Sequence, residues 1–185
     1  AKPDMKSFGA TVQLGQSRVS QGKTAPSLYG MVNVPLNETA ALRVVAFDRT
    51  SPGYIDNKST KSLDANKVQQ TGGRILFTVK PTQGLTATLV TSTQKTTQDD
   101  FSYVFGDPKK LEHDNPTLGR GTTQFDFSSL TVDYDLGSTT LTSITGNWKT
   151  KSNGVGDDTR LFGTLGLALP LVSRVSSGAS ESQSQ

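Results

Sequence analysis

Two-residue alternation of apolar and polar side chains is the feature that most restricts the folds open to this sequence. In residues 7–14, apolar side chains alternate with polar or glycine residues. A β-strand points successive side chains to opposite faces, so this pattern predicts a strand with one apolar and one polar face. Helical spacing is nearly absent from the sequence. The same alternation recurs, less regularly, in residues 28–34, 72–80 and 85–93.

One segment changes phase along its length. In residues 123–134, Phe125 and Phe127 share one face of an extended chain, whereas the apolar side chains from Leu130 to Tyr134 share the other. A β-bulge near Ser128 would explain the change, because a bulge inserts one extra residue. A strand that starts later would explain it equally well.

The connections between these strands are of two kinds. Short, Pro- or Gly-marked segments have the composition of tight reversals, and long polar segments separate them. The order is therefore strand, short turn, strand, long loop, repeated, which is typical of a transmembrane β-barrel. The short segments are residues 35–39, 81–84 and 135–138, and the long ones are about 50–71, 95–122 and 150–160.

Composition agrees with a sheet that is wet on one face. Only 32% of the residues are hydrophobic, and no stretch approaches the 18 apolar residues of a transmembrane helix. We predict an all-β fold, an antiparallel up-and-down meander of about seven or eight strands that is part of an outer-membrane β-barrel. Residues 1–175 would form the barrel segment, and the polar residues 176–185 would be a disordered tail.

Charge and residue types exclude several functions. The net charge of +3 comes from scattered residues, whereas nucleic-acid binding requires a concentrated basic surface. The chain has one histidine and no cysteine, so it offers neither a catalytic triad nor a thiolate metal site. We expect no enzymatic activity, no cofactor and no metal.

Several motifs in order resemble the barrel region of TonB-dependent outer-membrane receptors. The segment GMVNVPLNETAALRVVAFDRTSPGYIDN, residues 30–57, resembles a family hairpin whose second strand ends in Gly-Tyr-Ile-Asp-Asn. The segments GGRILFTVKPTQGLTATLV, LTVDYDLGSTTLTSITGNW and PLVSRVSS resemble further barrel hairpins, at residues 72–90, 130–148 and 170–177.

This resemblance implies a location and a function. Receptors of the family lie in the bacterial outer membrane, contact its lipid, and take up ferric siderophores or similar scarce nutrients with energy from the TonB system. Family members also carry a plug domain and a TonB box. Neither is recognisable here, so we expect a fragment of a larger barrel.

Candidate ligand contacts lie in the expected outer loops. The aromatic side chains could stack on a siderophore or sugar, and a basic side chain could bind an anionic ligand. His113 and the neighbouring carboxylates are expected to be solvated loop residues, not metal ligands. The candidate ligand-binding residues are Tyr54, Tyr103, Phe105 and Arg120.

Two other architectures remain open at this point. A soluble β-sandwich or meander could act as a binding or scaffold module, since seven or eight strands suffice for a sandwich. A small eight-stranded outer-membrane barrel is the other alternative, and it requires a last strand near residues 161–172. That strand would carry Leu161, Leu165, Leu167, Leu169 and Leu171.

Overall fold

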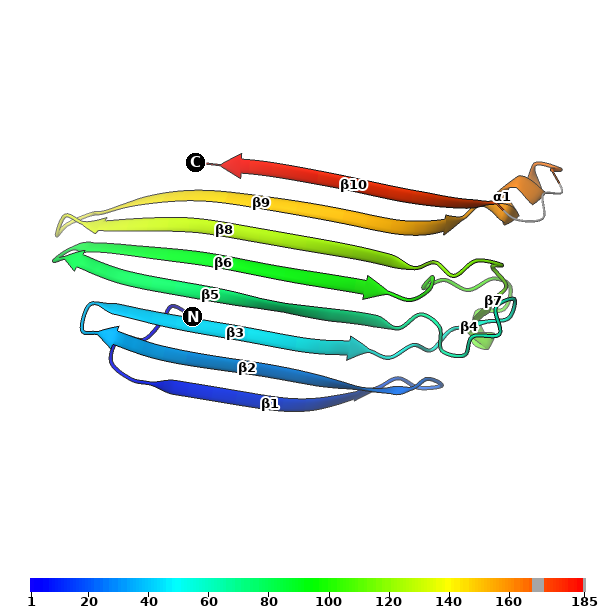
Figure 1. Ribbon diagram of the computed structural model, residues 1–185, viewed down its shortest axis with the longest axis horizontal. Helices are drawn as coiled ribbons and strands as arrows, with labels where there is room; N and C mark the ends of the chain where they lie inside the picture. Colours follow the sequence, from blue (N-terminus) through cyan, green and yellow to red (C-terminus); the bar gives the residue numbers. More distant parts are fainter. Residues whose placement is uncertain (168–171, 185) are drawn as a thin grey trace.

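The computed structural model describes residues 1–167 and 172–184, and its main body is one antiparallel sheet (Figure 1). Eight strands follow one another in chain order, each hydrogen-bonded to the strand before and after it. This confirms the predicted all-β meander. The strands are β1 (Gly9–Arg18), β2 (Thr24–Asn37), β3 (Ala40–Ser51), β5 (Val68–Thr82), β6 (Leu85–Gln98), β8 (Gly121–Asp135), β9 (Thr140–Asp157) and β10 (Ser173–Ser184).

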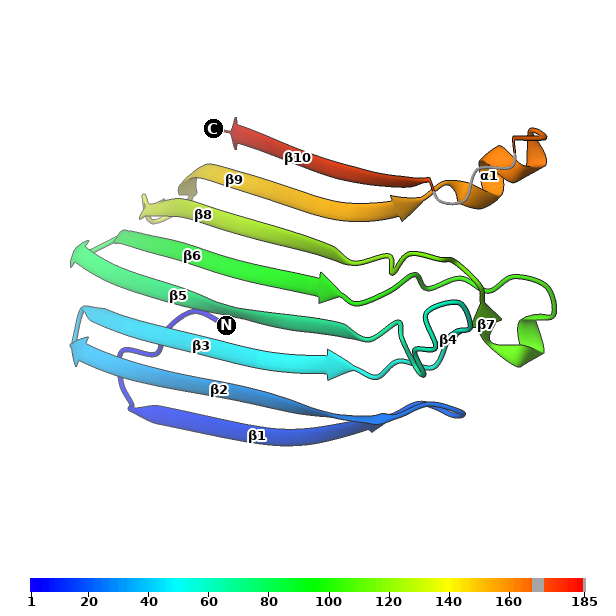
Figure 2. The same cartoon turned by 45° about the vertical axis from the view of Figure 1, so that its right-hand side comes forward.

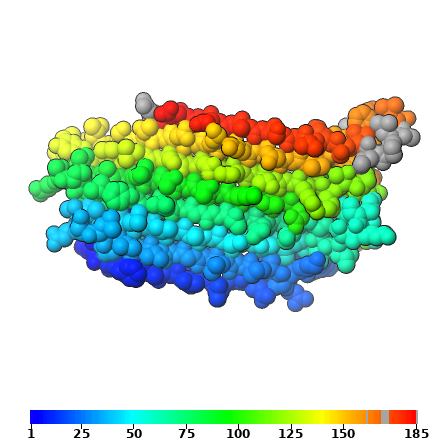
Figure 3. All heavy atoms as spheres, in the orientation of Figure 1, coloured from blue at the N-terminus to red at the C-terminus, as the bar shows by residue number. Residues whose placement is uncertain are grey.

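The sheet is open. Strands β1 and β10 form its two edges and do not pair with each other. Figures 1 and 2 show these edges on opposite sides of a twisted sheet. Figure 3 shows one broad face, on which the strands succeed one another from blue to red.

Short and long connections gather at opposite ends of the sheet, as the sequence predicted (Figure 2). At one end, which we call the turn pole, residues 38–39, 83–84 and 136–139 join successive strands. At the other end, the loop pole, residues 52–67 and 99–120 form long connections, and residues 19–23 form a shorter one. The chain also leaves β9 at this pole, after Asp157, so most of the loop predicted at about 150–160 belongs to that strand. Gly84 and Gly137 have φ values of 84° and 90°, a conformation that favours glycine and permits the tight reversal.

The phase change within residues 123–134 comes neither from a bulge nor from a late start of the strand, because β8 is continuous and carries apolar side chains on both of its faces. The pairing of β8 with β6 and β9 runs without a register shift through Ser128 and Ser129. Phe125 and Phe127 therefore lie on one face of the sheet, and Leu130 lies on the other.

Two expectations for the C-terminal region were wrong. Residues 176–185 were predicted to be a disordered tail, but Ser173–Ser184 form β10, whose register with β9 runs from Ser173–Asp157 to Ser184–Gly146. Backbone hydrogen bonds form this ladder and are largely indifferent to side-chain polarity. The last strand that the alternative eight-stranded barrel would require near 161–172 meets instead the short helix α1 (Thr159–Thr164). Leu169 and Leu171 lie outside the described residues.

Apart from register shifts at Pro35–Asn37 in β2 and Val79–Thr82 in β5, the register assigns each strand residue to one of two faces. Side chains paired across neighbouring strands share a face, and successive residues along a strand alternate. Face A carries Val12, Val32, Val44, Ile75, Leu89 and Leu130. Face B is the opposite face and carries Asn33, Arg43, Leu76 and Val90.

Burial differs between the two faces. Asn33, Ala41, Val45, Leu76, Thr78 and Thr88 are buried, and all of them point to face B. On face A, by contrast, large apolar side chains are exposed, including Val12 at 73% and Leu14 at 82%. Over β2 to β6 the side chains of face B are therefore crowded, whereas Phe125, Ile144 and Trp148 are exposed on the same face of β8 and β9.

The N-terminal segment 1–8 lies across face B near the turn pole. Asn33 holds it by accepting a hydrogen bond from the Asp4 amide at 2.8 Å and donating to the carbonyls of Asp4 and Ser7 at 2.9 Å. Arg43 donates to the Ala1 carbonyl at 3.0 Å. These contacts account for the nearly complete burial of Asn33 within a mostly wet sheet.

Replacement of Gly72 by alanine should weaken the sheet. A Cβ atom there would lie 2.6 Å from the Thr93 carbonyl oxygen and 2.8 Å from Cζ of Phe47. We expect Gly72→Ala to lower the free energy of unfolding by about 1–3 kcal/mol. Gly30→Ala is the matched control, because a Cβ there meets no atom within 4 Å. Urea unfolding in detergent micelles, followed by fluorescence of Trp148, would measure both. Equal stabilities would contradict the prediction.

Candidate functional site

Two long loops meet at the loop pole and form a compact cap. The connection after β3 contains β4 (Asp56–Asn57), and the connection after β6 contains the 3₁₀ turn η1 (Pro108–Lys110) and β7 (Glu112–His113). Strands β4 and β7 pair in parallel, Asp56 with Glu112 and Asn57 with His113. We call residues 52–67 together with 99–120 the loop cap.

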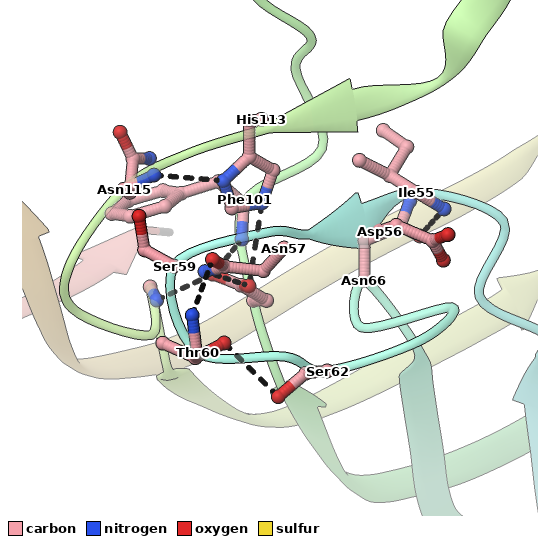
Figure 4. A network of polar contacts seen from close by, with 12 residues as sticks. Ile55, Asp56, Asn57, Ser59, Thr60, Ser62, Asn66, Phe101, His113 and Asn115 are labelled. Atoms are coloured by element: carbon pink, nitrogen blue, oxygen red, sulfur yellow. Dashed lines mark hydrogen bonds and ion pairs between the residues drawn. The ribbon is translucent and has the colours of Figure 1, made fainter.

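The buried carboxylate of Asp100 organises this cap, and Figure 4 labels its partners Asn57, Phe101 and His113. Asp100 is fully buried. Its Oδ1 accepts hydrogen bonds from the backbone amides of Phe101 and Gly119 at 2.8 and 2.7 Å. Its Oδ2 accepts one from Asn57 Nδ2 at 3.0 Å and lies 3.3 Å from Nε2 of His113. One side chain thus joins both loops to the start of β8.

His113 is the other buried member of the network, contrary to the expectation of a solvated loop residue. Its side chain has no solvent exposure. The Asn115 amide donates to its Nδ1 at 3.4 Å, and its Nε2 lies 3.3 Å from Asp100 Oδ2. The rings of Phe101 and Tyr103 pack against the imidazole, and their centroids lie 6.2 and 5.8 Å from the imidazole centroid. The pairing of β4 with β7 excludes water from the imidazole.

Asparagines support the rest of the cap. Asn66 Oδ1 accepts from the amides of Tyr54 and Ile55 at 2.8 and 2.9 Å, and Asn57 Oδ1 accepts from the Thr60 amide at 3.1 Å. These side chains are buried and replace the backbone ladder that an irregular loop lacks. Sequence reasoning missed them, since nothing distinguishes a buried loop asparagine from an exposed one in a single sequence.

Two of the four predicted ligand contacts lie together. Tyr103 and Phe105 have ring centroids 5.0 Å apart, and Phe101 stacks on the other side of Tyr103 at 5.0 Å. The guanidinium of Arg160, from α1, lies 3.9 Å from the Phe105 ring centroid and also pairs with Asp114. This aromatic row is partly exposed, with Tyr103 at 39%.

The other two predicted contacts lie elsewhere. Tyr54 is half-buried, and its amide is bonded to Asn66 inside the cap. Arg120 lines a separate cavity of about 540 Å³ together with Lys23 and Lys67. Those lysines pair with Asp64 at 3.7 Å and Asp99 at 3.0 Å. The structure therefore does not gather the four residues into one site.

Metal ligands do not converge in the described part of the chain, where no group of three or more histidine or acidic side chains is arranged to hold an ion. Within the same residues, no helix has the length and apolar character needed to cross a membrane.

Face A is a second candidate functional surface. Residues paired directly across successive strands form register rows, and each row on this face changes from apolar to polar at one point. In rows nearer the turn pole, the change from apolar to polar side chains occurs on strands further along the chain. The last apolar and first polar residues of three such rows are Leu28 and Asp48, Ile75 and Thr91, and Leu130 and Thr145.

The apolar part of face A is therefore a diagonal band. From the turn pole it extends to Leu28 on β2, but only to Leu89 on β6 and Leu130 on β8, so its border towards the loop pole is diagonal. Its side chains are unusually exposed, for example Leu28 at 49% and Leu89 at 46%. We call this surface the apolar band.

No family model, curated protein or solved structure matches this chain. The functional argument therefore rests on the apolar band and the loop cap.

Removal of the Asp100 carboxylate should open the loop cap. In Asp100→Ala, the amides of Phe101 and Gly119 and the Asn57 side chain lose their buried acceptor. We expect the local free energy of opening to fall by about 3–5 kcal/mol. Asp99→Ala is the matched control, because Asp99 is 44% exposed and its partner Lys67 is 48% exposed. Trypsin cleavage at Lys109 and Lys110 would report opening, and equal cleavage of both variants would contradict the role of Asp100.

The Tyr103 phenol should titrate at unusually high pH. Although Tyr103 is 39% exposed, partial desolvation of its phenol, opposed in part by the hydrogen bond from Asn115, raises the pKa of Tyr103 above its usual value of 10.0. Because the folded pKa exceeds the unfolded one, this stabilising contribution is complete below pH 10 and is lost as the pH rises through the folded pKa. The ultraviolet titration of the wild type minus that of Tyr103→Phe should show a phenolate transition above pH 10. A transition at or below pH 10 would contradict the burial.

Proposed function

We propose that this chain forms part of the wall of an outer-membrane β-barrel, in a receptor of the TonB-dependent class. In this proposal the apolar band contacts lipid, the turn pole faces the periplasm and the loop cap faces the outside. The receptor would take up a small ligand, such as a ferric siderophore, with energy from the TonB system. Its ligand class comes from the sequence resemblance alone.

The diagonal course of the apolar band is the observation that carries the proposal. A membrane is flat, so a lipid-contacting band runs diagonally across the register only if the strands are tilted. The border shifts by about six residues over the four strand-to-strand steps from β2 to β8, or about 1.5 residues per step. With a rise of about 3.3 Å per residue and a strand spacing of about 4.8 Å, this shift corresponds to a tilt of about 45°. Transmembrane barrels have tilts of about 35–45°.

The same tilt accounts for the polar character of β10. The border of the apolar band reaches the turn-pole end of β9, where Leu141 is the last exposed large apolar residue of that strand on face A. Strand β10 pairs only with residues 146–157 of β9, nearer the loop pole. In the tilted arrangement, β10 as described lies wholly on the loop side of the band. The serine and glycine residues on both faces of β10 then fit a part of the barrel wall that lies outside the membrane, in water.

A soluble β-sandwich explains these observations less well. A sandwich covers its apolar face with a second sheet, and one face would be apolar along the whole of each strand. Here ten or so large apolar side chains of face A are exposed, and the same strands are polar on that face nearer the loop pole. A small eight-stranded barrel would require β1 to pair with β10, and these strands form separate edges.

The loop cap suits an outward-facing position. Its interior is fixed by buried hydrogen bonds, so it is ordered without support from a second layer. Its aromatic row presents Tyr103 and Phe105 beside Arg160, a combination that suits a planar or anionic ligand.

An arginine placed in the apolar band tests this proposal. Ile75 is 45% exposed on face A of β5, so water would tolerate Ile75→Arg, whereas hydrocarbon would not. We expect this variant to lose about 2–4 kcal/mol of folding free energy in phospholipid vesicles. Thr71→Arg is the control, on the same face and strand but beyond the border, and should lose less than about 1 kcal/mol.

Refolding from urea into vesicles, followed by Trp148 fluorescence, would measure both variants. Equal behaviour of the two, together with cooperative folding of the wild type in plain buffer, would favour the soluble module instead.

A further inference from the structure

Face B has a hollow near the loop pole that the proposed membrane wall does not require. It has a volume of about 500 Å³ and lies over β1, β2 and β3. Its lining includes Gln13, Gly15, Ser27, Tyr29, Phe47 and Arg49, all of which point to face B.

Small residues form the floor of the hollow. Gly15 and Ser27 are paired across β1 and β2, and they precede Arg49 in the same register row. Gly15 carries no side chain of its own, and the Ser27 hydroxyl lies over it, 2.5 Å from where a Cβ of Gly15 would be. The floor is therefore lower than its surroundings.

Aromatic rings form the walls. Tyr29 and Phe47 are direct register partners, yet the Phe47 ring leans away towards β5. Its Cζ comes within 2.8 Å of the place where a Cβ of Gly72 would lie. Because Gly72 lacks that atom, the ring rests on β5 and leaves the space beside Tyr29 unfilled. The two rings flank a space that suits a flat apolar group.

Arg49 supplies an unpaired positive charge at the rim. Gln70 accepts a hydrogen bond from its Nε at 2.6 Å, which orients the guanidinium. Within the described residues no carboxylate pairs with Arg49. The carboxylates of face B, Asp133 and Asp135, lie at the turn pole, at the opposite end of the strands. The two terminal nitrogens remain available for a carboxylate.

We propose that this hollow binds a small aromatic carboxylate, with the ring between Tyr29 and Phe47 and the carboxylate on Arg49. The site deepens the proposed function, on which it rests, because it gives the inner face of the wall a ligand class of its own. Gln13 and Ser27 supply neutral hydrogen-bonding groups beside the charge.

Isothermal titration of the full chain in detergent micelles tests this proposal. The probe is 2-naphthoate, with neutral 2-naphthamide and ringless acetate as comparisons. We expect 2-naphthoate to bind at least about tenfold more tightly than either comparison, because only 2-naphthoate combines ring and charge. Equal affinity for the amide, or no binding of 2-naphthoate up to its solubility, would overturn the site.

Paired arginine variants separate a specific site from general attraction. Arg49→Gln should weaken 2-naphthoate binding by about tenfold or more, since it removes the charged donor. Arg74→Gln, on face B of the neighbouring strand and outside the hollow, should change it by less than about twofold. Equal weakening by both variants would show diffuse attraction and overturn the proposal.

Far-ultraviolet circular dichroism of the same samples separates failure of the site from failure of the wall. A β spectrum without 2-naphthoate binding contradicts only the hollow. A wild-type chain that gains no β spectrum in micelles contradicts the membrane wall and, with it, the site.

Discussion

Backbone hydrogen bonding between neighbouring strands is the interaction on which the rest of this structure depends. The ladder runs without a crossover from β1 to β10 and fixes the register of each strand against the next. A shift of one residue would move a whole strand's side chains to the other face. The apolar band, the crowded face B and the hollow beside Arg49 all follow from this one register.

In the hydrocarbon of a membrane, a hydrogen-bond ladder between strands has to be continuous. Hydrocarbon satisfies no backbone N–H or C=O group, so only helices and closed sheets cross it. The open edges β1 and β10 therefore require further strand partners in the proposed barrel. The N-terminal segment on Asn33 and Arg43 lies on face B, which would face the water-filled interior of the proposed barrel. Polar contacts there and exposed apolar side chains on face A reverse the usual arrangement of a soluble sheet.

Local patterns predicted the strands, the turns and their division between two poles. Alternation fixes the faces of residues such as Val12 and Ile75, and Gly84 or Gly137 marks a reversal, because both signals depend only on neighbouring residues.

Three features depend on distant partners and were missed: the order of β10, the uninterrupted course of β8 and the buried pair Asp100–His113. The polar composition of residues 176–185 suggested disorder. Only the strand register shows that β10 pairs with the part of β9 beyond the apolar band, where a polar strand is expected in the proposed barrel. Asp100 and His113 are buried because two loops far apart in sequence meet, and no local pattern records that meeting. Of the predicted ligand contacts, Tyr103 and Phe105 do lie together, whereas Tyr54 and Arg120 do not join them.

Tilted strands in a flat membrane are the central claim, and a pair of labelled cysteines tests it most directly. The chain has no cysteine, so each introduced thiol carries the only label. Val12 and Thr93 belong to one register row on face A, linked through Gly30, Ala46 and Gly73. With an environment-sensitive fluorophore in phospholipid vesicles, the label at Val12 should report hydrocarbon and the label at Thr93 should report water. The same environment at both positions would contradict the account.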